Sequence, residues 1–191
     1  MEDIIVEYIL GYYMHCNTPW IDVDHVLMPV HVDSMEHWIL VHFDVHNRCL
    51  NIFYSLQGKL NEGKALRTIK RFSFLLPYFL ELVGFFSARK DLNLSSEFYA
   101  NKKPTDPLEV YMVEGLPEQQ LNDCGVFVIA YAEYFIHGML DELKKNFQVQ
   151  NYRNKLSLEL YMHGKKKQIK GYESDFDFKG RLSKKMKNTK T

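Results

Sequence analysis

The chain has 191 residues, 46% of them hydrophobic, which suffices for one domain with a substantial core and an additional tail. Lys and Arg number 24, and Asp and Glu also number 24, so the net charge is zero. The charges are unevenly spread: residues 151–191 hold 12 Lys and Arg against 4 Asp and Glu, a net charge of +8, which leaves −8 on residues 1–150. We expect a folded domain over residues 1–150, and a helix with a basic, solvated tail over residues 151–191.

Composition also argues against export and membrane insertion. The longest apolar segment, residues 72–86, is too short to span a membrane and contains Pro77. The N-terminal sequence MEDIIVEYIL lacks the basic region of a signal peptide. The three cysteines, Cys16, Cys49 and Cys124, are too sparse for a disulfide framework. We therefore expect an intracellular protein, nuclear or cytoplasmic, that has no membrane partner.

The first half of the chain predicts a short helix and three strands. Residues 2–15 have a helical pattern, and residues 24–31 are β-branched and apolar, as in a strand that ends or bulges near Pro29. Residues 37–44 and 48–55 alternate in polarity on either side of a short turn, which predicts a β-hairpin.

The second half predicts a helix, a polar surface loop, a strand and two helices, at residues 62–86, 87–107, 109–113, 123–137 and 152–163. Pro77 should kink or divide the first of these helices, because proline has no N–H to donate. The mixture of helices and strands predicts an α+β fold.

The most informative sequence is QQLNDCG at residues 119–125, followed by the apolar run VFVIAYAEYF. It places Cys124 at the start of a predicted helix, where unpaired N–H groups and the helix dipole favour a thiolate. Asn122 or Asp123 suits the N-cap, and Gly125 would let a substrate backbone approach closely. An upstream glutamine amide can point at a carbonyl oxygen that becomes an oxyanion. Free cysteines are most often small buried residues, but these surroundings favour a nucleophile.

A histidine that could serve such a nucleophile opens the first hairpin strand, as His37-Trp38. A histidine and a cysteine that meet only in the fold are the minimum for thiol catalysis, because the imidazole takes the proton and the thiolate attacks. His15-Cys16 is a weaker alternative pair, since no capped helix follows it.

These motifs, in this order, resemble the ubiquitin-like-protein-specific cysteine proteases, the SUMO or sentrin type, which cleave after the Gly-Gly of SUMO or NEDD8. The resemblance covers residues 20–140. It implies a papain-like α+β fold that lacks the family's N-terminal part, of the kind carried by plant mobile elements. It also implies a ubiquitin-like partner of the SUMO or NEDD8 class, and neither a metal nor an organic cofactor.

The same resemblance assigns roles to individual residues. His37 would be the general base and Cys124 the nucleophile. Gln119 or Gln120 would be the oxyanion donor. Trp38 would form one wall of the diglycine channel. The family commonly has about five residues between the glutamine and the cysteine, whereas Gln119 leaves four and Gln120 three.

The third member of the family's catalytic triad is replaced. The family places an aspartate on the strand after the His-Trp strand, where this chain has Tyr54. A turn at residues 46–47 pairs residues whose numbers sum to 93, so Tyr54 should face Ile39 and lie diagonally from His37. Asp44 should point to the other face, about 23 Å away. A tyrosine hydroxyl can accept from imidazole but cannot stabilise imidazolium as a carboxylate does, so we predict residual rather than full activity.

Two hypotheses follow: an active peptidase or isopeptidase, and a catalytically impaired relic that binds a ubiquitin-like protein. A weaker third one is contact with nucleic acid through the basic tail, which lacks an aromatic stacking platform. We predict no metal site, because His42 and His46, four residues apart, would suit zinc only on a helix and here lie on a hairpin.

Overall fold

The computed structural model describes residues 2–12, 18–56, 58–120 and 122–171. The chain divides into two compact units, Met1–Val149 and Gln150–Thr191. The elements in order are α1 (Glu2–Ile9), the 3₁₀ helix η1 (Trp20–Asp22), β1 (His25–Val32), the 3₁₀ helix η2 (Asp33–Met35), β2 (His37–Asp44), β3 (Cys49–Phe53), α2 (Lys59–Leu82), α3 (Phe85–Ala88), β4 (Glu109–Met112), α4 (Cys124–Ile136), α5 (Leu140–Asn146) and α6 (Val149–Ile169). Among the described helices, none has both the length and the apolar character that a membrane crossing requires.

The described strands form one sheet in the order β1-β2-β3-β4. β1, β2 and β3 are antiparallel neighbours, and β4 pairs parallel to β3. The hairpin register is the predicted one: Leu40 pairs with Phe53 and Asp44 with Cys49, so paired numbers sum to 93. The α+β class is confirmed as well. Pro29 does not end β1, which runs on to Val32 as an edge strand that tolerates a missing N–H.

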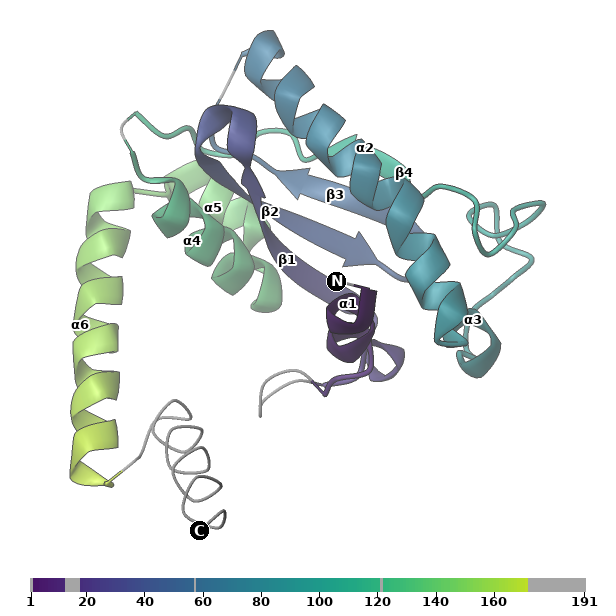
Figure 1. Cartoon of the computed structure of the whole chain (residues 1–191). Coiled ribbons are helices and arrows are strands. Elements are labelled where there is room, and N and C mark those ends of the chain that lie inside the picture. Colours follow the sequence, from purple (N-terminus) through teal and green to yellow (C-terminus); the bar gives the residue numbers. More distant parts are fainter. Residues whose placement is uncertain (1, 13–17, 57, 121, 172–191) are drawn as a thin grey trace, which may run out of the picture. The chain divides into compact units, whose positions relative to one another are not determined.

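Helices cover both faces of the sheet (Figure 1). Residues 39, 41 and 43 of β2 alternate inward towards α2, and their apolar side chains join Ala65 and Ile69 in the main core. On the opposite face, Phe53 packs against Tyr131 and Phe135 of α4. Three layers result, with the sheet in the middle.

Pro77 neither divides nor ends α2, which continues to Leu82. Because Pro77 has no N–H, the carbonyl of Ser73 lacks its partner four residues on. That carbonyl instead accepts the backbone N–H of Leu108, at 3.0 Å. The proline therefore creates the acceptor that ties α2 to the residue just before β4, and α2 ends instead near Gly84, which has a φ of +70°.

The segment predicted as a surface loop, residues 87–107, contains no strand and only the end of α3, but it is anchored rather than loose. The guanidinium of Arg48, 1% exposed, donates to carbonyls of this segment and its edge, those of Lys103, Pro104, Asp106 and Pro107, at 2.6–3.3 Å. The hydroxyl of Tyr99 donates to the Val45 carbonyl. The hairpin turn thus holds this segment in place.

The terminal helices differ from their predicted bounds. α1 ends at Ile9, ahead of Gly11 with a φ of +73°, and residues 13–15 of the predicted helix lie outside the described residues. α5 was not predicted. In the second unit, α6 extends beyond the predicted residues 152–163 and carries an ion pair between Lys155 and Glu159, at 3.8 Å.

Candidate active site

Cys124 is the first residue of α4, and Asp123 is the N-cap, as the sequence predicts. The Asp123 side chain makes no capping bond; its backbone carbonyl accepts the N–H of Phe127 at 3.0 Å. The thiol is partly exposed. A Cβ added at the exposed Gly125 would meet no atom within 4 Å, so the space beside the thiol is open to a ligand.

Cys124 and His37 lie at the same end of the sheet. α4 packs against β2, and the ring of Phe135, near the end of α4, is 4.4 Å from the ring of His42. Earlier α4 residues line a groove with Leu40, so helix and strand run in the same direction. Cys124 precedes Phe135 by about 16 Å along α4, and His37 precedes His42 by about 16 Å along β2. The fold therefore brings the starts of α4 and β2 together.

His37 is 3% exposed, and its Nε2 is buried without a hydrogen-bond partner among the described residues. Desolvation lowers the pKa of His37 below 6.5, and the nearby His31 adds to this effect. Native structures pair most buried polar atoms, and the exceptions deserve an explanation in terms of function or strain. A neutral imidazole can take a proton from a thiol, but nothing described here stabilises its charged form.

Tyr54 lies beside His37, as the predicted register requires. The two rings pack edge to face with centroids 5.4 Å apart, and Tyr54 is 7% exposed. Its hydroxyl donates to Met35 Sδ at 3.9 Å. Because His37 Nε2 has no hydrogen-bond partner among the described residues, the Tyr54 oxygen does not accept from it. Desolvation, with a contribution from Glu62, raises the pKa of Tyr54 to about 12, so the phenol is neutral. Tyr54 positions the imidazole by packing alone. Asp44 lies at the other end of β2.

The two candidate glutamines differ in how they are held. The backbone N–H of Gln119 donates to the carbonyl of Ser55 at 2.9 Å, and Ser55 Oγ donates to Gln119 Oε1 at 2.8 Å. Ser55 follows β3 by two residues, beyond the pair of Leu40 and Phe53, so Gln119 is fixed at the same end of the sheet. Gln120 is exposed. The role of Ser55 was missed, although the hairpin register places it there.

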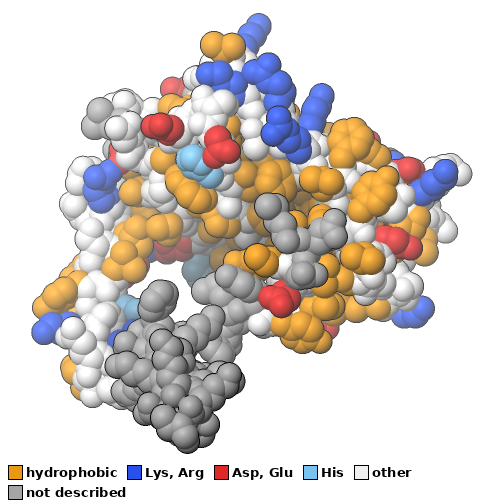
Figure 2. Space-filling model, in the orientation of Figure 1, with side chains coloured by type: hydrophobic (Ala, Val, Ile, Leu, Met, Phe, Trp, Pro, Cys, Tyr) orange, Lys and Arg blue, Asp and Glu red, His pale blue; other side chains and the backbone are white. Residues whose placement is uncertain are grey.

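Trp38 is 45% exposed and packs against His31 of β1, with the two rings tilted and their centroids 5.0 Å apart. His31 also lines a pocket with Lys64, Arg67 and Arg71 of α2. Lys and Arg side chains gather over the first half of α2 (Figure 2). A basic surface therefore adjoins the tryptophan that flanks His37, on a domain whose sequence is acidic overall.

Cys49 differs from Cys124 in its surroundings. Cys49 is buried in β3, where burial and the nearby Asp44 raise the pKa of its thiol to about 11. Such a thiol is a poor nucleophile. The alternative pair His15-Cys16 and tail residues 172–191 lie outside the described residues.

Comparison with known proteins supplies one match. No curated protein and no solved structure matches the chain. The family model described as Ulp1 protease family, C-terminal catalytic domain, matches residues 14–168. This match covers most of the 191 residues. The chain therefore belongs to the Ulp1 protease family of cysteine proteases that act on ubiquitin-like modifiers.

Proposed function

We propose that the protein is a slow cysteine peptidase or isopeptidase for a modifier of the SUMO or NEDD8 class, with Cys124 as nucleophile and His37 as general base. The observation that supports this proposal is that a helix N-terminal thiol and a buried histidine both lie at one end of the sheet. A neutral His37 fits a base that takes the thiol proton during attack, rather than a preformed ion pair.

The reaction would follow ordinary acyl transfer. The Cys124 thiol transfers its proton to His37, and the sulfur attacks the carbonyl carbon of the modifier's last glycine. His37 protonates the departing amine, and water then hydrolyses the thioester to release the modifier. We assign the oxyanion donor to Gln119 rather than Gln120, because hydrogen bonds with Ser55 hold both the backbone and the Oε1 of Gln119, whereas Gln120 is exposed.

Two features support recognition of a modifier with a diglycine tail. The open space at Gly125 leaves room for a backbone without side chains, and the exposed ring of Trp38 would form one wall of its channel. The basic pocket of Lys64, Arg67 and Arg71 adjoins His31 and would attract an acidic surface of the folded modifier.

The alternative function, a binding module for the same class of modifier, rests on Tyr54. With its hydroxyl donated to Met35, Tyr54 offers His37 no charged acceptor, so the imidazolium that forms during catalysis is poorly stabilised. The basic pocket and Trp38 would serve binding equally well without cleavage.

Electrophilic diglycine probes built on SUMO, NEDD8 and ubiquitin distinguish the two functions. We expect slow labelling by the SUMO or NEDD8 probe that both Cys124→Ala and His37→Ala abolish. A folded chain that binds the unmodified modifier but does not react supports the binding module. A folded chain that neither binds nor reacts contradicts both.

A further inference from the structure

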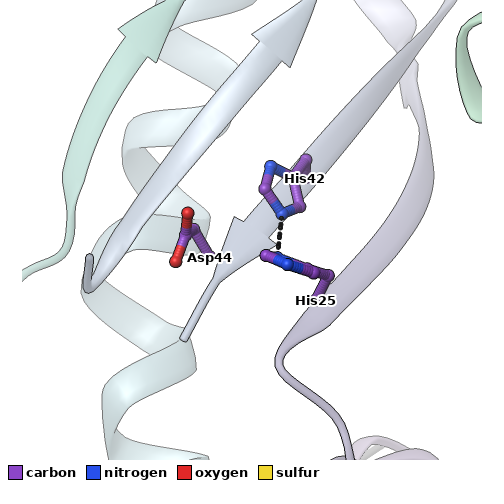
Figure 3. A group of neighbouring side chains, drawn as sticks. All are labelled: His25, His42 and Asp44. Atoms are coloured by element: carbon purple, nitrogen blue, oxygen red, sulfur yellow. Dashed lines mark hydrogen bonds between the residues drawn. The ribbon is translucent and has the colours of Figure 1, made fainter. Parts of the chain in front are cut away.

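A cluster of His25, His42 and Asp44 lies near the end of β2 (Figure 3), whereas His37 begins that strand. His25 of β1 is the register partner of Asp44, and His42 is two residues before Asp44 on β2, so the three side chains meet across the strand pair. His25 Nδ1 and His42 Nε2 are 3.0 Å apart. The nitrogen and oxygen atoms that the three residues can offer to a metal all lie within 4.8 Å of one another.

The spacing suits a zinc ion. Zn–N bonds of about 2.0–2.1 Å place two nitrogens of a tetrahedral site about 3.4 Å apart, so the two rings need to separate by only a few tenths of an ångström. The carboxylate of Asp44 is oriented by Asn47, which donates its backbone N–H to Oδ1 and its Nδ2–H to Oδ2, each at 2.9 Å. Each carboxylate oxygen keeps a second lone pair for a metal.

The surroundings of His42 supply the support that a ligating histidine requires. Asn51, its register partner on β3, has Nδ2 3.3 Å from His42 Nδ1. Turning this amide over would present Oδ1 to the Nδ1–H, which would leave Nε2 as the ligand atom. The ring of Phe135 packs against both imidazoles, at 4.4 Å from His42 and 5.6 Å from His25, and forms an apolar wall.

The cluster is also accessible. His42 is 4% exposed, but His25 is exposed and lines a pocket with Leu27, Phe135 and Ile136. A metal could enter through this pocket, and a water there would complete four ligands.

The other candidate cluster, Asp24, His46 and Asp91, differs in a decisive way. Arg89 donates to both of its carboxylates at 2.6 Å, so the guanidinium already neutralises the charge that would attract a metal ion. This cluster serves as a matched control.

We propose that His25, His42 and Asp44 form a zinc site with three protein ligands and an open fourth position. The site ties the edge strand β1 to β2 and lies away from Cys124. The sequence predicts no metal site from His42 and His46, which lie within one hairpin. The two histidines of the proposed site instead come from different strands and are 17 residues apart in the sequence.

The test uses the full chain with Cys124→Ser, so that the candidate nucleophile binds no zinc. Competition with a chromophoric chelator measures zinc affinity, and a thermal melt with and without ZnCl₂ measures stabilisation. We expect one equivalent of zinc to bind and to raise Tm. His25→Gln and Asp44→Asn should each weaken binding by more than the roughly 10–100-fold that loss of an outer-shell partner costs. Asn51→Ala should weaken it within that range.

His46→Gln should bind zinc as the parent does. The proposal is overturned if the parent binds no stoichiometric zinc, or if His25→Gln, an exposed substitution, binds as tightly as the parent. Either outcome would leave His25 and His42 as a hydrogen-bonded pair. Because the parent lacks the candidate nucleophile, these results are independent of protease activity.

Discussion

Substitution of Tyr54 by aspartate should return a charged acceptor to His37. The Tyr54 ring contacts the imidazole edge to face, and His37 Nε2 is buried with no hydrogen-bond partner among the described residues. A carboxylate at position 54 can accept from this nitrogen, raise the pKa of His37 and stabilise the imidazolium. We therefore expect Tyr54→Asp to react faster than the parent.

We expect Tyr54→Asp to raise the reaction rate by a large factor and to lower stability moderately. In a serine triad, replacing the acid by its amide lowers turnover by about 10⁴, or about 5.4 kcal/mol of activation free energy, which sets the upper limit of the gain. Removing a buried aromatic ring costs about 3–5 kcal/mol, and a hydrogen bond to a charged group returns about 1.5–3 kcal/mol. The free energy of unfolding should fall by about 2 kcal/mol, which a domain of ordinary stability tolerates.

The assay is the second-order rate constant of labelling by the SUMO and NEDD8 diglycine probes, with thermal melts to verify folding. Tyr54→Phe keeps the ring and loses only a hydroxyl that donates to Met35, so its rate should equal that of the parent. Tyr54→Asn should fall between the parent and Tyr54→Asp. The reasoning is refuted if folded Tyr54→Asp labels no faster than the parent, or if Tyr54→Phe loses reactivity.

Four further predictions concern the pH dependence of labelling and of stability, the oxyanion donor and the loop anchor. Desolvation, followed by the nearby His31, lowers the pKa of His37, so the labelling rate should stay constant below pH 6.5. In His31→Gln, the pH at which the rate falls should move upward, and a downward move would contradict this reasoning. The unfolded state binds more protons at this histidine, so its contribution to stability should decrease as pH falls below 6.5, as acid-dependent melts can measure. Ser55→Ala should slow labelling by about 10-fold or more with unchanged modifier affinity, since it removes the hydrogen bond to Gln119 Oε1; an equal rate would exclude this positioning role. Arg48→Met should remove about 3 kcal/mol of stability, because it removes the hydrogen bonds by which a buried guanidinium holds this segment, and should lower Tm by about 6–12 °C; a change below 2 °C would contradict that anchor.

The local pattern of the sequence determined the hairpin, its register and the position of Cys124. The alternation of polar and apolar residues determines which side chains share a face of the sheet, and a short turn determines which residues pair. Counting residues from the turn therefore predicted the contact between Tyr54 and His37. Likewise, a polar cap before an apolar run placed Cys124 at the first turn of α4. Both signals act over a few residues and need no knowledge of the rest of the chain.

Only the tertiary structure decided the contacts between segments far apart in sequence. The Ser73 carbonyl that Pro77 leaves unpaired is satisfied by Leu108, so the proline could remain inside α2. Arg48 is buried because the carbonyls of residues 103–107 surround it, and Gln119 is fixed by Ser55, 64 residues earlier. His25 meets His42 only because β1 pairs with β2. Hydrogen-bond partners at such separations depend on how the chain crosses the sheet, which no local pattern of residues encodes.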